Sequence, residues 1–224
     1  IQAGSWATVK GTNLANNTRI WGDSDIVNGN LPTSLDGTSI KVAGKSAAIY
    51  FISAGQINFQ VPDLGDQTGD VPVEITTPTG TVTTTARVQS VAPAFFMFDA
   101  EDRKYIAGLT QDFKFLGKQS LFPTLTIRPA RPGETVQLYG TGFGATNPAT
   151  PALKTVTAVA NTANRVTATV GGVDAVVQFA GLVAAGEYQI NIVVPASLPD
   201  GDHKVVTTVN GVSSPDNAFI TVQR

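Results

Sequence analysis

A tryptophan followed by two acidic residues is the segment of this chain whose residue types could most readily do chemistry. The segment WGDSDIVNGN places Trp21 ahead of Asp23 and Asp25, with two asparagines after them. Carboxylate and amide oxygens are the ligands that Ca²⁺ takes in proteins, but the spacing differs from that of an EF-hand loop. Such residues also bond to nearby backbone in turns. We therefore predict no bound metal or other cofactor, and keep Ca²⁺ binding by this loop as an alternative.

Trp21 is also the best candidate for stacking on a sugar, because an indole ring presents a flat apolar face. The alternative places Trp21, like Trp6, in the hydrophobic core, and for both residues that interpretation is preferred. Trp21, Asp23 and Asp25 are nevertheless our candidate ligand contacts.

The chain is poorly provided with groups for catalysis. It has no cysteine, which excludes disulfides, thiolate metal sites and a cysteine nucleophile. Its one histidine, His203, comes after a turn, and no nucleophile-elbow spacing accompanies it, so we expect a surface histidine. Asp63, Asp66 and Asp70 lack a recognised ligand spacing and are expected to be turn residues. We predict no catalytic residue and no enzymatic activity.

The glycine-rich run GTGFG, from Gly140 to Gly144, has a superficial likeness to a phosphate-binding loop. No Lys-Ser or Lys-Thr pair follows it, and no helical pattern opens after it. We expect these glycines to allow a bulge or a kinked strand instead.

Charge and hydropathy exclude two broad classes of partner. Charged residues make up 14% of the chain and the net charge is −2, without a cluster of Lys and Arg, which argues against nucleic acid. No apolar run approaches the roughly 20 residues of a membrane helix, so we expect no membrane insertion. Abundant Thr, Val, Ala and Gly favour strands with polar, uncharged outer faces.

These residues must be positioned by a chain that repeats itself. AGSWATVKGTNL lines up with PGETVQLYGTGF, IKVAGKSAAIYF with ATVGGVDAVVQF, and GQINFQVPDL with YQINIVVPAS. The matched blocks keep their order at a nearly constant offset, which indicates a tandem duplication.

The repeated phrase QINxxVP predicts a half-buried strand in each copy. Ile57 and Phe59 alternate with polar residues, and the proline that follows ends the strand. We expect Asn58 and Asn191, on the polar face, to bond to loop backbone. Several short strands between glycine turns are typical of a β-sandwich. We predict an all-β chain of two tandem immunoglobulin-like β-sandwich domains.

The predicted domains span residues 1–91 and 92–224, and the second begins with a long connector. Residues 92–130 are too long and too apolar for a plain linker. KYIAGLT and FKFLG predict an extra β-hairpin at the start of the second domain. Phe95, Phe96 and Phe98 form the densest apolar patch, and we predict that they contact the other domain or a partner.

Three segments carry a resemblance to a known family: VAPAFFMFD, RPGETVQLYGTGFG and VGGVDAVVQFAGLVAAGEYQINIVVPASLPDGDHKVVTTVNGVSS. They resemble an uncharacterised family of C-terminal domains in large predicted secreted proteins of acidobacteria. That family is similar to the immunoglobulin-like IPT/TIG modules of cell-surface receptors and glycan-active enzymes. The resemblance covers Val91 to the C-terminus well and the first copy more loosely.

The resemblance implies an extracellular or cell-surface module, and it transfers no catalytic residue. Because the chain opens directly on a predicted strand, we expect it to be part of a larger secreted bacterial protein with neighbouring domains. We predict a non-catalytic structural or adhesion module that contacts a protein or a glycan. Two alternatives stay open: a carbohydrate-binding module accessory to an enzyme, and a hydrolase with a cleft between the domains.

Overall fold

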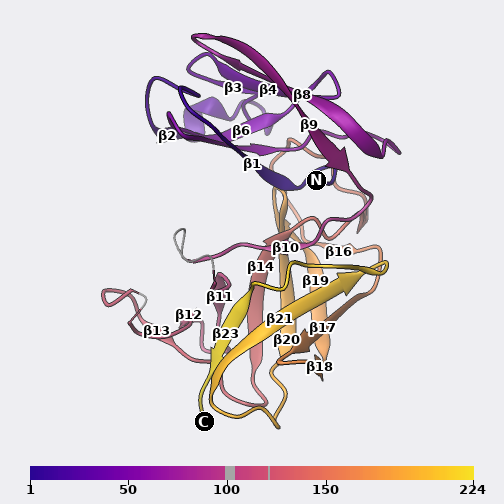
Figure 1. Cartoon of the computed structure of the whole chain (residues 1–224). Helices are drawn as coiled ribbons and strands as arrows, with labels where there is room; N and C mark the ends of the chain where they lie inside the picture. Colours follow the sequence, from indigo (N-terminus) through magenta and orange to yellow (C-terminus); the bar gives the residue numbers. More distant parts are fainter. Residues whose placement is uncertain (99–103, 121) are drawn as a thin grey trace. The chain divides into compact units, whose positions relative to one another are not determined.

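The computed structural model describes residues 1–98, 104–120 and 122–224. Over these residues the regular secondary structure consists of β-strands and one short 3₁₀ turn, η1 (Asp23–Asp25) (Figure 1). The prediction of an all-β fold with tandem immunoglobulin-like β-sandwiches is confirmed. The described residues form two compact units.

Unit 1 comprises residues 1–91 together with the segments 149–158 and 184–186, and unit 2 comprises 92–148, 159–183 and 187–224. The duplication did not indicate that two later segments of the chain would join the first unit. The domain limits 1–91 and 92–224 stay a prediction.

Unit 1 contains two sheets. The first has the order β1 (Trp6–Lys10), β7 (Gln56–Gln60), β6 (Ala48–Ile52) and β2 (Arg19–Ile20). The second has the order β3 (Ser34–Leu35), β4 (Thr38–Val42), β8 (Gly69–Thr77) and β9 (Gly80–Val88), with β5 (Lys45–Ser46) beside β4.

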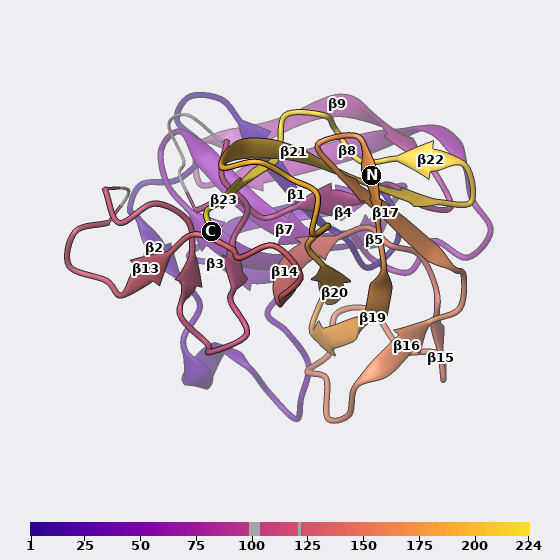
Figure 2. The same ribbon diagram turned by 90° about the horizontal axis from the view of Figure 1, so that it is seen from below.

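Unit 2 also contains two sheets. The first follows the path β13 (Ile127–Arg128), β12 (Phe115–Leu116), β11 (Gly108–Leu109), β14 (Thr135–Thr141), β20 (Glu187–Val193), β19 (Val177–Ala184), β16 (Ala160–Thr162) and β15 (Thr146–Asn147), and β10 (Ala94–Phe95) pairs with β14. The second has the order β18 (Val173–Ala175), β17 (Val166–Val170), β21 (Gly201–Val209) and β22 (Val212–Ser213), with β23 (Phe219–Val222) also on β21. Figure 2 shows β20, β19, β16 and β15 following one another.

The repeated phrase forms a strand in each unit, as predicted, and the strand lies inside its sheet rather than at an edge. β7 pairs with β1 on one side and β6 on the other, and β20 lies between β14 and β19. Ile57 and Ile190 occupy the same position of the phrase, and both are fully buried. The alternating pattern therefore identified the face of each sheet that meets the core.

The expected role of the two asparagines was wrong. Asn58 Oδ1 accepts hydrogen bonds from Thr8 Oγ1 at 3.0 Å and from Gln56 Nε2 at 2.7 Å. Asn191 Oδ1 accepts one from Gln189 Nε2 at 2.9 Å. Residues two apart on a strand share a face, so the polar side chains of the phrase reach one another rather than a loop.

A different side chain of the phrase bonds to loop backbone. Gln60 is 2% exposed; its Nε2 donates to the carbonyl oxygen of Gly4 at 3.0 Å, and its Oε1 accepts from the amide of Leu153 at 2.9 Å. All three residues belong to unit 1. Valine stands at the matching position of the second copy, so this contact belongs to one copy alone.

The predicted extra hairpin is present and is short. Leu109 of β11 lies opposite Phe115 of β12, and the intervening turn is held by the Thr110 hydroxyl, which donates to Asp112 at 2.7 Å. β11 also pairs with β14, so the hairpin extends the first sheet of unit 2.

The glycine-rich run serves the close approach of two backbone segments. A Cβ on Gly140 would collide with the carbonyl oxygen of Ala94, and a Cβ on Gly142 would overlap that of Ala92. Gly142 also has a φ of +79°, which L side chains rarely adopt. The run therefore lets β10 lie against the end of β14, and this explains its glycines without a phosphate.

Replacing Gly142 by Ala should destabilise the protein by about 2–4 kcal/mol, because the strain of the positive φ adds to a backbone collision. Gly172→Ala is the matched control: its φ is also +79°, but nothing lies within 4 Å of the added Cβ. The control should cost about 1 kcal/mol, from strain alone. Urea unfolding of both variants measures the difference, and equal losses would contradict the close-approach explanation.

Candidate functional site

Trp21 lies in a cluster of three aromatic rings in unit 1. Its ring centroid is 4.9 Å from that of Tyr50, at a near-perpendicular angle of 78°, and 5.7 Å from that of Trp6. All three residues are half-buried, and Trp21 packs against the hydrophobic core. Trp6 Nε1 donates to the carbonyl oxygen of Ala185 at 2.7 Å. The rings thus pack edge to face and hold this end of the unit together.

The acidic residues after Trp21 meet an arginine. Arg19, on β2, donates through Nη1 to Asp25 at 2.8 Å and through Nε to Asp36 at 2.9 Å. The other carboxylate contact of Asp25 is the amide of Gly22, at 2.7 Å, which closes the η1 turn. Asp23 is exposed. The three predicted ligand contacts are close in sequence, but Asp25 serves the loop itself.

The electrostatics of this loop follow from its ion pairs. The hydrogen bonds from Arg19 and then from the Gly22 amide lower the pKa of Asp25 to about 2. Arg19, followed by Asn17, also lowers the pKa of Asp36. Both carboxylates raise the pKa of Arg19 above its ordinary value. These groups therefore stay charged together over the whole neutral range.

The geometry of these loops gives little support to the Ca²⁺ alternative, because their polar side chains bond to nearby backbone. Asn30 Nδ2 donates to the carbonyl oxygen of Val27 at 3.0 Å, which is the turn role that asparagine commonly takes. Asp63 similarly accepts the amide of Gly65 at 2.9 Å. Within residues 1–98, 104–120 and 122–224, no three His, Cys, Asp or Glu side chains gather in a group that could hold a metal ion.

Arg19→Gln should raise the pKa of Asp25 from about 2 toward the roughly 3.9 of an unpaired aspartate. Because the folded pKa lies below the unfolded one, Asp25 stabilises the native state above about pH 4 and loses that contribution as the pH falls toward about 2. NMR titration of the carboxyl carbon measures both proteins. Lys41→Gln, which removes the partner of Glu74, is the control, and an unmoved Asp25 midpoint in Arg19→Gln would refute the pairing.

The three phenylalanines of the predicted contact patch separate into different environments within unit 2. Phe95 is buried, 7% exposed, with its ring centroid 6.2 Å from that of Phe143. Phe96 is half-buried in the segment that pairs with β14. Phe98 is half-buried and packs edge to face on Phe115 at 5.6 Å. Phe95 thus belongs to the core of unit 2, and the predicted contact with a domain or partner stays a prediction.

A second charged cluster lies in unit 2, on β21. Asp202 accepts hydrogen bonds from Lys104 Nζ at 2.9 Å, Lys118 Nζ at 2.9 Å, Tyr105 Oη at 2.8 Å and Thr221 Oγ1 at 2.8 Å. Partial burial opposes ionisation, but these bonds outweigh it and hold the pKa of Asp202 well below its usual range. The cluster fastens the connector to β21.

His203, next to this cluster, has a local partner. Its Nε2 lies 2.8 Å from the carbonyl oxygen of Pro199, and the residue is half-buried. This contact closes the turn before β21, so the imidazole has a structural role in the turn.

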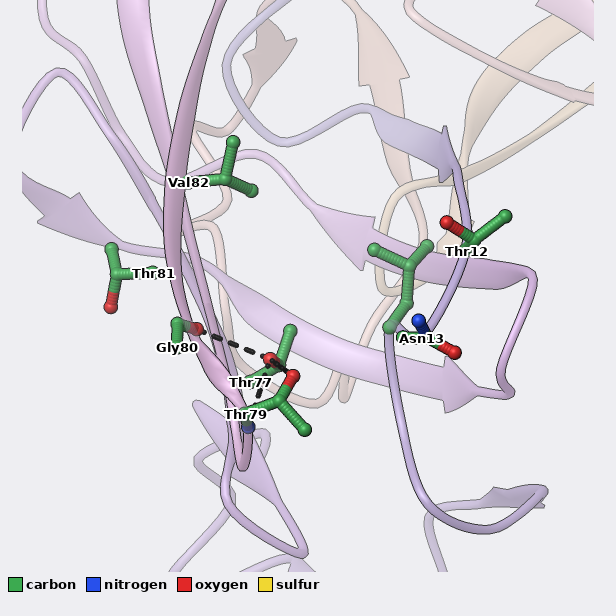
Figure 3. Close-up of a pocket in the computed structure, with 8 residues that line it drawn as sticks. Thr12, Asn13, Thr77, Thr79, Gly80, Thr81 and Val82 are labelled. Carbon is green, nitrogen blue, oxygen red and sulfur yellow. Dashed lines mark hydrogen bonds between the residues drawn. The ribbon is translucent and has the colours of Figure 1, made fainter.

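An open depression of about 190 Å³ lies at the tip of the β8–β9 hairpin in unit 1. Figure 3 shows Thr12 and Asn13 on one side of it, and Thr77 and the residues from Thr79 to Val82 on the other. The hydroxyl of Thr77 donates to the carbonyl oxygen of Gly80 at 3.1 Å and accepts the amide of Thr79 at 3.3 Å, which fixes the hairpin tip. The lining consists of uncharged hydroxyl, amide and aliphatic groups.

The strand that leads away from this depression is the feature that the sequence analysis missed. Every residue of β9 from Gly80 to Thr85 is exposed, including Val82 at 57%. Val82 lies opposite Ile75, a core residue, so its face of the sheet remains uncovered there. The signal in the sequence is the run TPTGTVTTTA, where threonine replaces the apolar residues that an inward face requires.

Comparisons with known proteins place these observations among related folds. Residues 1–90 match the family model described as the IPT/TIG domain. A search of curated protein sequences gave no match.

Three solved structures match this chain at low sequence identity and low TM-score. The Bacteroides ovatus mixed-linkage glucan utilization locus protein SGBP-B, in complex with a mixed-linkage heptasaccharide, is 12% identical with a TM-score of 0.38, over 100% of this chain and 42% of that one. SGBP-B from a complex xyloglucan utilization locus in Bacteroides uniformis is 13% identical with a TM-score of 0.30, over 96% and 45%. Domains 5-6 of the S-layer protein SbsC are 13% identical with a TM-score of 0.29, over 99% and 91%.

The chain spans less than half the length of the two SGBP-B chains. The match of residues 1–90 to the IPT/TIG model confirms that part of the predicted resemblance for the first copy, the copy with the looser resemblance. Residues 1–90 are similar in sequence to IPT/TIG domains, and unit 2 repeats the immunoglobulin-like architecture.

Proposed function

We propose that this chain is a non-catalytic structural or adhesion module that contacts another protein, within a larger secreted bacterial protein that acts outside the cell or at its surface. The observation that carries the proposal is the exposed, uncharged stretch from Gly80 to Thr85 of β9, at the edge of unit 1. An edge strand presents unpaired backbone groups, which are a template for another chain. The similarity of residues 1–90 to the IPT/TIG domain supports the assignment to non-catalytic modules.

The charged groups support a non-catalytic role. Arg19 and Lys104 are engaged by the carboxylates of Asp25 and Asp202, respectively. A catalytic acid or base needs a pKa near the working pH, whereas Asp25 and Asp202 are held far below neutrality. These groups thus hold loops in place and do not suit proton transfer.

The setting outside the cell rests on the resemblance to secreted C-terminal domains, and their acidobacterial source is part of the same proposal. No helix among the described residues is long and apolar enough to cross a membrane.

The glycan alternative depends on Trp21 and is testable on the intact chain. Because Trp21, Tyr50 and Trp6 pack at steep angles and are half-buried, they offer no flat row of rings for a sugar chain. We expect a glycan array probed with the labelled protein to give no signal above that of Trp21→Ala. Binding by the wild type that the substitution abolishes would replace the proposal with a carbohydrate-binding module.

The location is tested on intact cells of the source organism. Antibodies against the chain should label unpermeabilised cells or the culture medium, and protease added to intact cells should remove the cell-bound label. An antibody against a cytoplasmic protein is the control. Labelling that requires permeabilisation would contradict the extracellular setting.

A further inference from the structure

One edge of unit 1 has no neighbouring strand along most of its length among the described residues. β9 ends the order β3, β4, β8, β9 and pairs with β8 in an unbroken register from Gly80 to Val88. In an antiparallel pair, alternate residues direct both of their peptide groups to the partner and the others direct theirs away. Half of the peptide groups of β9 therefore face the open edge.

Two hydrogen bonds show which residues of β9 face that edge. The amino group of Ile1 donates to the carbonyl oxygen of Arg87 at 2.8 Å, and the amide of Gln89 donates to the carbonyl oxygen of Ile1 at 2.9 Å. This is the bonding pattern of a parallel bridge. The peptide groups of Arg87 and Gln89 therefore face the open edge, and by alternation those of Thr85, Thr83 and Thr81 face it as well. No strand of the described chain pairs with these three threonines.

Unit 2 shows the same edge with a strand on it. Ala130 forms a parallel bridge with Val222 of β23: its amide donates to Thr221 at 2.8 Å, and its carbonyl oxygen accepts the amide of Gln223 at 2.8 Å. Ile1 and Ala130 hold matching positions in the duplication, two residues before Ala3 and Pro132. The two contacts are equivalent.

The equivalence breaks down two residues earlier on the edge strand. In unit 2, Tyr105 lies in a parallel bridge with Phe219: the amide of Ile106 donates to Phe219 at 3.1 Å, and the amide of Phe219 donates to Lys104 at 2.7 Å. Thr221 and Arg87 accept the equivalent hydrogen bonds from Ala130 and Ile1. Phe219 and Thr85 each lie two residues before these positions, so Thr85 is the residue of unit 1 that matches Phe219. Thr85 has the same outward peptide groups, and no described segment takes the place of Lys104 to Ile106.

We propose that β9 of unit 1 accepts an extended peptide strand of a partner protein, added in parallel register along Thr81 to Thr85. The inference rests on the proposed protein-contact function and names the contact. Addition of a strand to a sheet edge gains affinity from main-chain hydrogen bonds and specificity from alternate side chains.

The side chains of β9 indicate the chemistry of the accepted strand. Val82, Thr84 and Ala86 lie opposite the buried Ile75, Val73 and Val71 of β8, so they mark the core-facing side. Residues of the added strand beside them face the same way, toward the depression that Val82 lines with Leu14 (Figure 3). Apolar residues at alternate positions would cover Val82, as Ile106, 1% exposed, covers the corresponding side of unit 2.

The two copies also differ in the devices that keep an edge from pairing. Pro215 and Asp216 interrupt the edge of unit 2 between β22 and β23, and proline and charge are the usual protections of such edges. The corresponding run of unit 1, Thr81 to Ala86, has neither. The uninterrupted, uncharged edge therefore suits pairing.

The test uses the whole chain and a synthetic peptide, acetyl-Lys-Thr-Ile-Thr-Val-Tyr-Ile-amide, whose tyrosine takes the position of Tyr105 opposite Thr85. The expected result is slower amide exchange at Thr81, Thr83 and Thr85 on saturation. In parallel pairing the amide of the peptide valine points toward β9 and that of its tyrosine points away. N-methylation of the valine should weaken binding roughly tenfold or more, and N-methylation of the tyrosine by less than about twofold.

Thr83→Pro supplies the complementary change on the protein, since proline is tolerated where an amide faces away from the sheet. It should abolish peptide binding, and circular dichroism checks that the variant folds. Thr84→Val is the control and should bind as the wild type does, because the peptide groups of Thr84 face β8. If Thr83→Pro fails to fold, the methylated peptides still decide the matter on unaltered protein.

Three outcomes would overturn the proposal: no protection of the three threonine amides, equal weakening by both methylated peptides, or protection that grows with protein concentration without peptide. The last would assign the edge to a second copy of this chain. If the peptide does not bind, while antibodies label intact cells and the glycan array gives no signal, the strand site is refuted and the proposed extracellular, non-catalytic module is not.

Discussion

Both units depend on the alternation of buried and exposed side chains along one central strand. A shift of one residue in register would turn every apolar side chain of that strand away from the core, so β7 and β20 fix the placement of the strands beside them. Ile57 and Ile190 are fully buried at matching positions. The core face is therefore the same in both copies, while the polar face was free to change. That freedom is visible in Gln60, which ties two loops in unit 1 where the second copy has a valine.

The alternation, the terminal prolines and the glycine turns made the all-β fold, the duplication and the connector hairpin predictable, because each is a local consequence of the residues involved. The membership of segments 149–158 and 184–186 in unit 1 was not, since their contacts, such as that of Trp6 with Ala185, join residues far apart in the sequence. The roles of Asn58 and Gln60 were confused for a similar reason. A polar face predicts hydrogen bonding, but the partner depends on which loops the fold brings near. The open edge of β9 escaped notice because its signal is the lack of an apolar pattern.

Several charges of the chain are joined in compact networks. Arg19 joins Asp25 to Asp36, and Arg128 donates to Asp112 at 2.9 Å and to Glu134 at 2.9 Å. Each network ties a loop or connector to a strand, so these charges are used internally. Isolated exposed ion pairs stabilise little, but an arginine shared by two carboxylates also fixes the geometry of the segments that carry them. The exposed stretch of β9 from Gly80 to Thr85, by contrast, carries no charge.

A duplicated fold with one covered and one open edge is best understood as a division of roles. In unit 2 the chain itself supplies Tyr105 and Ala130 to β23, so that edge is satisfied within the unit. Among the described residues of unit 1, Ile1 makes the equivalent contact, and no strand pairs with the outward peptide groups of Thr81, Thr83 and Thr85. An exposed edge is a liability for any soluble protein, and natural sequences protect it with proline, charge or a bulge. Here the covered edge of unit 2 has the proline and the aspartate, and the open edge of unit 1 has an uninterrupted run of threonine and valine. Protection against aggregation alone would favour the opposite arrangement. It is the arrangement that an edge kept for a partner requires.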